Sequence, residues 1–343
     1  MTDARPRLAI TLGDVAGIGP EIVVRALAQP DVLTWCRPVV VGHPELLRRT
    51  ARSLGVSFNT AEQDTAGDVG IACWNPGGDE VLDIVPGQIQ AAAGRAAYES
   101  LVAATRAALA GDVDAIVTAP LHKEALHAAG LPFPGHTEIL AAECGVDEVA
   151  MMLYLPPGDV VRGPQGLGVA HATLHTSIRS VPGLLSEARI ADTIRLLDRF
   201  LRDLGGEPRI GVCALNPHAG EHGLFGDEET TIIAPAVERC RGEGINATGP
   251  IAADALLRRA VAGEFDGVVA MYHDQGHIAL KLIGFDRAVN VTLGLPIVRT
   301  SPSHGTAFDI VGQGQANPEG LLAAMRVACQ LARTRRNVLA PRQ

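Results

Sequence analysis

The chain has 343 residues, of which 47% are hydrophobic and 20% charged, so it can bury the cores of about two domains. This composition excludes a disordered or fibrous protein. The net charge is −9 and no run of Lys and Arg occurs, so we expect no nucleic-acid partner. No apolar run reaches about 18 residues and the N-terminus lacks a leader pattern, so we expect a cytoplasmic protein without a membrane partner.

Small residues dominate the apolar fraction, since aromatic residues make up 3% and glycine occurs 38 times. Such residues suit helices packed closely on a buried parallel sheet, which predicts the α/β class. The six cysteines lie far apart without a C-x-x-C pair, which indicates buried, reduced thiols.

Short runs rich in β-branched residues end in Gly, Pro or polar residues and lead into helix-like segments, the rhythm of βαβ units. Expected strands cover residues 7–14, 38–42, 115–120, 209–217 and 267–274. Long helices are expected at 89–109 and 184–204, where apolar residues recur at three- and four-residue steps. No linker or repeat separates two halves, so we expect interwoven domains between which the chain crosses more than once.

A glycine-rich segment, GDVAGIGPE, follows the first expected strand and precedes a helix that Pro20 can start. Gly13, Gly17 and Gly19 allow a tight turn and close backbone approach, as in phosphate-binding loops. The segment matches neither G-x-G-x-x-G nor a P-loop, so a plain strand-to-helix turn remains an equal alternative.

Histidines gather where expected strands end, in three H-x-x-x-H spacings: His171 with His175, His218 with His222, and His273 with His277. On a helix this spacing forms a zinc pair, but Pro217, Gly220 and Gly276 are expected to break the helix locally. We therefore expect one histidine from each spacing to bind a metal and leave a coordination position open for substrate. The alternative is that they are hydrogen-bonded or surface histidines.

A third polar cluster lies between residues 273 and 318, where Lys281, Asn290, Arg299 and His304 interrupt apolar segments. Arg presents a planar fork and Lys a compact charge, both of which suit phosphate or carboxylate. The cluster favours a binding site over scattered surface charge.

Together these motifs resemble the 4-hydroxythreonine-4-phosphate dehydrogenase family of vitamin B6 biosynthesis and its paralogues. The resemblance rests on GDVAGIGPE, GHTE (135–138), NPHAGE (216–221), YHDQG (272–276), NVTLGLP (290–296), RTS (299–301) and HGTAFDI (304–310), in register from about residue 7 to 330. It implies two α/β/α domains with a cleft between them, as in isocitrate and isopropylmalate dehydrogenases. The domains would span 1–133 with 300–343, and 134–299. The second would carry the interface of a homodimer with shared active sites.

The resemblance also implies roles for individual residues. Metal ligands fall on His175, His218 and His273. Substrate contacts fall on His136, Thr137, Lys281, Asn290 and Arg299. Candidates for proton transfer are Lys281, Asp254 and Asp274. Contacts to the nucleotide fall on His304, Gly305, Thr306, Asp309 and Asn317.

The implied activity is metal-dependent oxidation of the secondary hydroxyl of a small phosphorylated hydroxy acid by NAD or NADP, followed by decarboxylation. Zinc is the first expectation for the metal, with magnesium, manganese or cobalt as alternatives. Val15 replaces the family's usual Pro, and TAPLHKEAL (118–126) is closer to the paralogues. The substrates left open are therefore those of 4-phospho-D-threonate or 4-phospho-D-erythronate dehydrogenases and, without phosphate, of aromatic cis-dihydrodiol dehydrogenases. A non-catalytic relative that only binds ligand is the remaining alternative.

Overall fold

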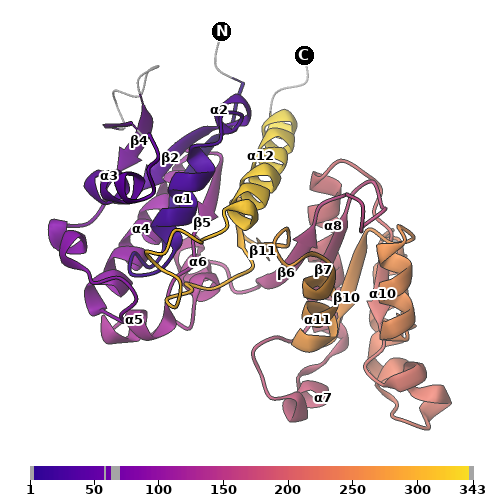
Figure 1. Ribbon diagram of the computed structural model, residues 1–343. Coiled ribbons are helices and arrows are strands. Elements are labelled where there is room, and N and C mark those ends of the chain that lie inside the picture. Colours follow the sequence, from indigo (N-terminus) through magenta and orange to yellow (C-terminus); the bar gives the residue numbers. More distant parts are fainter. Residues whose placement is uncertain (1–3, 58, 63–69, 340–343) are drawn as a thin grey trace. The chain divides into compact units, whose positions relative to one another are not determined.

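The computed structural model describes residues 4–57, 59–62 and 70–339. The chain divides into two compact units, which are described separately (Figure 1). Unit 1 comprises Met1–Val149 and Leu295–Gln343, and unit 2 comprises Ala150–Gly294. Each unit is a sheet covered by helices, which confirms the α/β class, and the chain crosses between the units twice.

The unit boundaries differ from the expected positions at 133/134 and 299/300, since the crossings lie at 149/150 and 294/295. Residues 134–149 were expected in the second domain but belong to unit 1, and they contain helix α6 (His136–Cys144). Its residues Ile139 and Leu140 are buried in one hydrophobic cluster with Leu101 of helix α4 (Ala91–Ala110). This packing assigns α6 to unit 1.

Unit 1 contains a parallel sheet in the order β3-β4-β2-β1-β5-β12. The strands are β1 (Arg7–Thr11), β2 (Arg37–Val41), β3 (Thr60–Glu62), β4 (Ile71–Trp74), β5 (Ala115–Thr118) and β12 (Arg299–Pro302). Their central members are buried on both faces, as parallel strands between helical layers require. For example, Ala9 and Ile116 face the cluster that contains Leu101 of α4.

Helices cover this sheet, with α12 (yellow in Figure 1) packed on β12, β5 and β1 and with α4 packed on β1, β2 and β5. The bounds are α1 (Gly19–Leu27), α2 (Val32–Trp35), α3 (Pro44–Ser53), α5 (Lys123–Ala128) and α12 (Glu319–Leu339), with a 3₁₀ turn η2 (Asp79–Asp83). As expected, Pro20 stands in the first turn of α1, where its missing N–H leaves no helical hydrogen bond unmade.

Unit 2 contains strands in the order β11-β6-β7-β10-β8-β9. They are β6 (Ala150–Leu155), β7 (Leu167–His171), β8 (Ile210–Cys213), β9 (Ala247–Ile251), β10 (Gly267–Ala270) and β11 (Val289–Leu293). Strands β7, β10, β8 and β9 pair in parallel, whereas β6 pairs antiparallel with both β7 and β11. Leu293 lies opposite Ala150 in this register, so the chain enters and leaves unit 2 at neighbouring positions.

The helices of unit 2 are α7 (Val181–Leu184), α8 (Glu187–Asp203), α9 (Ala234–Gly242), α10 (Ala253–Val261) and α11 (His273–Gly284). Shorter turns are η3 (Ile178–Ser180), η4 (Pro217–Gly223) and the π-helical η5 (Glu229–Ile233). The Ser186 hydroxyl accepts from Arg189 N and so caps α8. None of the helices in the described ranges has the length and apolar character needed to span a membrane.

Candidate active site

The three expected histidine clusters follow strands β7, β8 and β10 of unit 2. His171 is the last residue of β7, His218 follows β8, and His273 follows β10. Because β7 and β8 both pair in parallel with β10, their carboxyl ends lie at one edge of the sheet. This is the edge at which ligands bind in α/β proteins.

Helix α11 begins at His273, directly after its N-cap residue Tyr272. The expectation that Gly276 breaks the helix is wrong, since α11 continues through it to Gly284. A Cβ on Gly276 would lie 2.5 Å from His171 Nε2, so the glycine permits close packing of the helix on β7. The helical repeat then places His273, His277 and Lys281 on one face.

His175 and His273 form an outer pair of imidazoles, with ring centroids 5.9 Å apart. The side chain of His273 is 38% exposed and that of His175 is also exposed. Asp274 Oδ1 lies 2.7 Å from His273 Nδ1. A carboxylate on one ring nitrogen orients the ring and leaves the other nitrogen, Nε2, for a ligand.

His171 and His277 form an inner pair beneath the outer one, with 3.1 Å between His277 Nδ1 and His171 Nε2. Both side chains are buried. Burial lowers the pKa of His171 to about 4 and that of His277 to about 3, so both rings are neutral at neutral pH. The structure thus separates the members of two H-x-x-x-H spacings into exposed and buried imidazoles.

The third cluster adopts a left-handed turn within η4. From His218 to His222 the backbone has φ values between 44° and 78°, and only Gly220 among these residues tolerates them without strain. Each of the others costs about 1–2 kcal/mol in such a conformation. The expected break in right-handed helix is therefore correct, and sustained strain of this kind is characteristic of functional loops.

The buried carboxylate of Glu229 holds the start of this turn. Its Oε1 accepts hydrogen bonds from Leu215 N at 2.9 Å and Asn216 N at 2.8 Å. Its Oε2 accepts from Asn216 Nδ2 at 3.0 Å. Sequence reasoning missed Glu229, because only the π-helical geometry of η5 shows where its side chain points.

Within the described residues, no three or more His, Cys, Asp and Glu side chains are arranged to hold a metal ion. The structure therefore brings His175 and His273 together but does not add His218 to them. The convergence of all three on one metal stays a prediction.

The other expected residues of unit 2 lie on three elements, namely Lys281 on α11, Asn290 on β11 and Asp254 on α10. Lys281 Nζ lies 5.7 Å from the centroid of the Phe285 ring. Asn290 of β11 donates from Nδ2 to Met151 Sδ at 3.3 Å, and its Oδ1 has no hydrogen-bond partner among the described residues. Asp254 is exposed in the first turn of α10.

The expected phosphate-binding residues lie in unit 1. Arg299 is buried at the start of β12, where its Nη2 donates to Thr118 Oγ1 at 2.7 Å. Burial lowers the pKa of Arg299 to about 10, which leaves the guanidinium charged at neutral pH. Burial, and then the nearby charge of Arg299, lower the pKa of His136 well below its usual value. His136 and Thr137 open α6, so the structure brings this helix start to the buried cation.

The expected nucleotide-binding residues follow β12. His304 Nδ1 lies 3.0 Å from the Gly305 carbonyl oxygen, and the Asp309 carbonyl accepts from Gln313 Nε2. The Asn317 side chain accepts from Glu319 N at 3.0 Å and so caps α12. A Cβ on Gly305 would meet no atom within 4 Å, so this part of the loop borders open space.

The glycine-rich segment packs against the same loop, since Ile18 N donates to the Thr306 carbonyl at 3.0 Å. A Cβ on Gly17 would lie 2.6 Å from that carbonyl oxygen, which explains the glycine by close backbone approach. Glu21 adds a second link, since its Oε1 accepts from Gly312 N at 2.6 Å.

Two polar residues beside this junction were not predicted. Asp14 is buried, and burial raises the pKa of its carboxyl group. Among the described residues, neither Asp14 Oδ2 nor His122 Nδ1 has a hydrogen-bond partner. The His122 ring stacks on Phe308 with 4.8 Å between centroids. The position of Asp14 in the glycine-rich segment that follows β1 was the available signal, and His122 carried none.

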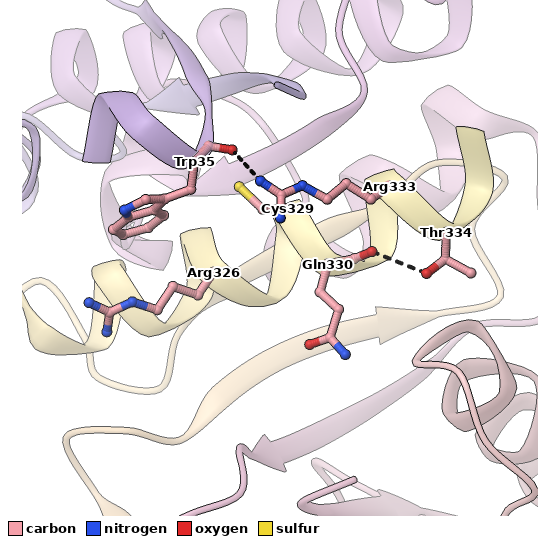
Figure 2. A pocket seen from close by; sticks show the side chains of 6 residues that line it. All are labelled: Trp35, Arg326, Cys329, Gln330, Arg333 and Thr334. Carbon is pink, nitrogen blue, oxygen red and sulfur yellow. Dashed lines mark hydrogen bonds between the residues drawn. The ribbon is translucent and has the colours of Figure 1, made fainter. Parts of the chain in front are cut away.

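A separate hollow of about 510 Å³ lies between α2 and α12 (Figure 2). Its lining residues are Trp35, Arg326, Cys329, Gln330, Arg333 and Thr334. Arg326 lies over the Trp35 ring, 4.9 Å from its centroid, and Arg333 donates to the Trp35 carbonyl. None of the expected site residues lines this hollow.

Comparisons with known proteins give a consistent result. Residues 34–328 match the family model described as pyridoxal phosphate biosynthetic protein PdxA. A 4-hydroxythreonine-4-phosphate dehydrogenase of Geobacter metallireducens is 44% identical, over 98% of this chain and 98% of the relative. A D-threonate 4-phosphate dehydrogenase of Salmonella typhimurium is 45% identical, over 95% of this chain and 98% of the relative.

Solved structures agree with these sequence matches. A 4-hydroxythreonine-4-phosphate dehydrogenase from Klebsiella pneumoniae has a TM-score of 0.83 and 43% identity, covering 95% of this chain and 99% of that one. A terephthalate 1,2-cis-dihydrodiol dehydrogenase from Burkholderia xenovorans has a lower TM-score of 0.67 and 34% identity, covering 95% of this chain and 98% of that one.

Proposed function

This chain belongs to the family of the pyridoxal phosphate biosynthetic protein PdxA, and from that membership we propose that it is a nicotinamide-dependent dehydrogenase of a small phosphorylated hydroxy acid. It oxidises a secondary hydroxyl with NAD or NADP, and the resulting β-keto acid loses CO₂. Relatives of similar identity are named for 4-hydroxythreonine-4-phosphate and for D-threonate 4-phosphate, so these two substrates are the leading candidates.

The observation that carries the phosphate assignment is the buried cation of Arg299 beside His136. Burial of a charged group is costly unless its partners or a ligand compensate for the lost water. A guanidinium can donate to two phosphate oxygens at once, and the start of α6 adds His136 and Thr137 as further donors. This arrangement suits a phosphorylated substrate better than an aromatic dihydrodiol.

The imidazoles at the sheet edge of unit 2 fit a divalent metal in their chemistry. His175 and His273, whose ring centroids lie 5.9 Å apart, would hold it through their imidazole nitrogens, and Asp274 orients His273. Zinc is the first candidate, with magnesium, manganese and cobalt as alternatives. When bound, the metal supplies Lewis-acid stabilisation of negative charge on the substrate oxygens.

We assign the remaining groups from the family motifs in which they stand. His218 is the third ligand, brought to the set within a homodimer whose second subunit completes each site. Lys281 and Asn290 contact the substrate, and the loop from His304 to Asn317 binds the nucleotide. Asp274 acts by orienting His273, which leaves Lys281 and Asp254 as the candidates for proton transfer.

The decisive experiment is a kinetic comparison of 4-phosphohydroxy-L-threonine, 4-phospho-D-threonate and 4-phospho-D-erythronate with their dephosphorylated analogues and a cis-dihydrodiol, each with NAD and with NADP. We expect one phosphorylated compound to be oxidised far faster than its dephosphorylated analogue. Faster turnover of a cis-dihydrodiol than of every phosphorylated compound would instead establish the dihydrodiol alternative. No reduction of either nucleotide, in the presence of each candidate metal, would support a non-catalytic ligand-binding protein.

A further inference from the structure

The inner imidazole pair, His171 and His277, lies directly behind the proposed metal ligand His273. The rings of His273 and His277 stack with 3.8 Å between centroids and 12° between planes. Both residues belong to the first two turns of α11, so this stack is built into the helix. His277 then contacts His171 of β7 through the 3.1 Å hydrogen bond between their nitrogens.

This hydrogen bond fixes both rings. Two neutral imidazoles can bond only when an N–H of one meets a lone pair of the other, so their tautomers and orientations are set together. His171 Nδ1 further lies 3.5 Å from the Met151 carbonyl oxygen of β6. The stack is thereby tied to the sheet.

The packing of helix α11 on strand β7 also holds His277 close to His171. The backbone of Gly276 passes so close to His171 that a Cβ would lie 2.5 Å from its Nε2 and 2.6 Å from Val169 Cγ1. Helix α11 can therefore reach its position only with glycine at 276. An apolar pair of similar volume would fill the space without burying polar atoms, so packing alone does not account for two histidines.

We propose that His277, held by its hydrogen bond to His171, is a positioning residue that fixes the ring of His273 for metal binding. His277 supports the His273 ring by stacking, while Asp274 holds its Nδ1 from the solvent side. The inference rests on the proposed metal function, because it concerns one of the ligands assigned there. The inference adds His277 and His171 as a second layer of residues behind the ligand His273. This layer connects His273 to strand β7.

The test is cobalt binding by the purified full-length protein, stripped of metal and titrated with Co²⁺, with affinity and the visible d–d spectrum as readouts. His171→Leu removes one partner of the hydrogen bond, and His277→Phe removes the other while keeping a ring to stack. We expect each variant to weaken cobalt binding about tenfold and to alter the spectrum, as loss of groups behind a metal ligand does. The double variant should lose little more than either single one, because both break the same bond.

Two matched variants separate positioning from general stability. His171→Gln keeps a hydrogen-bonding atom near the position of Nε2 and should retain the wild-type spectrum and most of the affinity. Leu280→Val weakens the packing of the same helix, since Leu280 is fully buried, and leaves all the imidazoles unchanged in sequence. It should lower the thermal unfolding temperature while leaving the spectrum unchanged.

The outcomes are distinct. Wild-type affinity and spectrum in both His171→Leu and His277→Phe would overturn the inference while leaving the proposed metal site intact. Equal weakening by Leu280→Val would also overturn it, because helix packing alone would then explain the effect. If the wild-type protein bound no cobalt, zinc or manganese, the proposed metal function itself would fail, and the inference with it.

Discussion

Arg299 keeps its charge in a buried setting, so its replacement should act mainly on substrate binding. We expect Arg299→Met to lose a charge-assisted contact worth about 1.5–3 kcal/mol, or roughly tenfold to more than a hundredfold in kcat/KM for the phosphorylated substrate. Metal affinity and activity on the dephosphorylated analogue should change little. If parent and variant used the phosphorylated substrate equally well, the phosphate assignment would fail.

Asp274 contacts His273 Nδ1 at 2.7 Å and should act on the metal through that ring. We expect Asp274→Asn to weaken metal affinity about tenfold, because the amide orients and polarises the imidazole less than the carboxylate does. Asp286→Asn is the matched control, since Asp286 is exposed just beyond the same helix. Isothermal titration with Zn²⁺ measures both, and equal affinities would contradict the role of Asp274.

At the residue scale, the sequence indicated which residue types matter but not which atoms meet. The spacing of His273 and His277 was visible, yet their different environments were not, because His277 is buried by β7, which lies about a hundred residues away in sequence. Arg299 was recognisable from its motif, whereas Glu229 and Asp14 were not. The significance of Glu229 lies in hydrogen bonds to Leu215 and Asn216, and that of Asp14 in its burial, and only the folded chain creates either.

The left-handed turn η4 depends on an element that follows it, the π-helical η5 with Glu229. Loss of that carboxylate leaves the amides of Leu215 and Asn216 without their acceptor in a partly buried setting. We expect Glu229→Ala to lower the free energy of unfolding by about 1–3 kcal/mol in urea denaturation. Glu238→Ala, which removes an exposed ion pair with Arg241, should change it by less than about 1 kcal/mol.

The junction between the glycine-rich segment and the loop after β12 gives a second prediction at the scale of elements. Gly305→Val adds a side chain where a Cβ meets no atom within 4 Å, so it should leave the fold intact. It should nevertheless raise the KM for the nucleotide substantially, because the added group occupies the space assigned to the adenosine half. An unchanged nucleotide KM, measured beside an unchanged unfolding temperature, would place the nucleotide elsewhere.

The positions of strands and helices could be predicted where apolar residues recur at a regular spacing along the sequence. The helix expected at 89–109 is α4 (Ala91–Ala110), and the strands expected near 38, 115 and 267 are β2, β5 and β10. Local propensity disfavours glycine in a helix and so predicts a break at Gly276, whereas contact with His171 requires glycine there. Tertiary packing thus overrides the local rule where the site is built.

For the whole molecule, we expect the catalytic form to be a homodimer. Within the described residues His175 and His273 lie close together, and the proposed site takes its third ligand, His218, from the assembly of two subunits. A second subunit can complete such a site, and its interface should then be large and fairly apolar. Sedimentation at assay concentration measures this, and a catalytically competent monomer would contradict it.

The α/β class was predictable from composition and rhythm, because small apolar residues and β-branched runs leave few other ways to bury the chain. The boundaries between the units were harder to predict from the sequence. Helix α6 follows a proline-rich loop, and only its packing with Leu101 of α4 shows to which core it belongs. Sequence gives no direct sign of such long-range packing.

The register of β11 on β6 places the entry and exit of unit 2 side by side, with Leu293 opposite Ala150. At the level of the gene, one continuous coding segment specifies residues 150–294, and the two ends of this unit are neighbours in the sheet. Two crossovers at these positions can exchange the histidine-bearing segment with that of a relative and leave Arg299 and the nucleotide loop in place. The histidine-bearing segment can therefore be inherited, or engineered, separately from Arg299 and from the loop that follows β12.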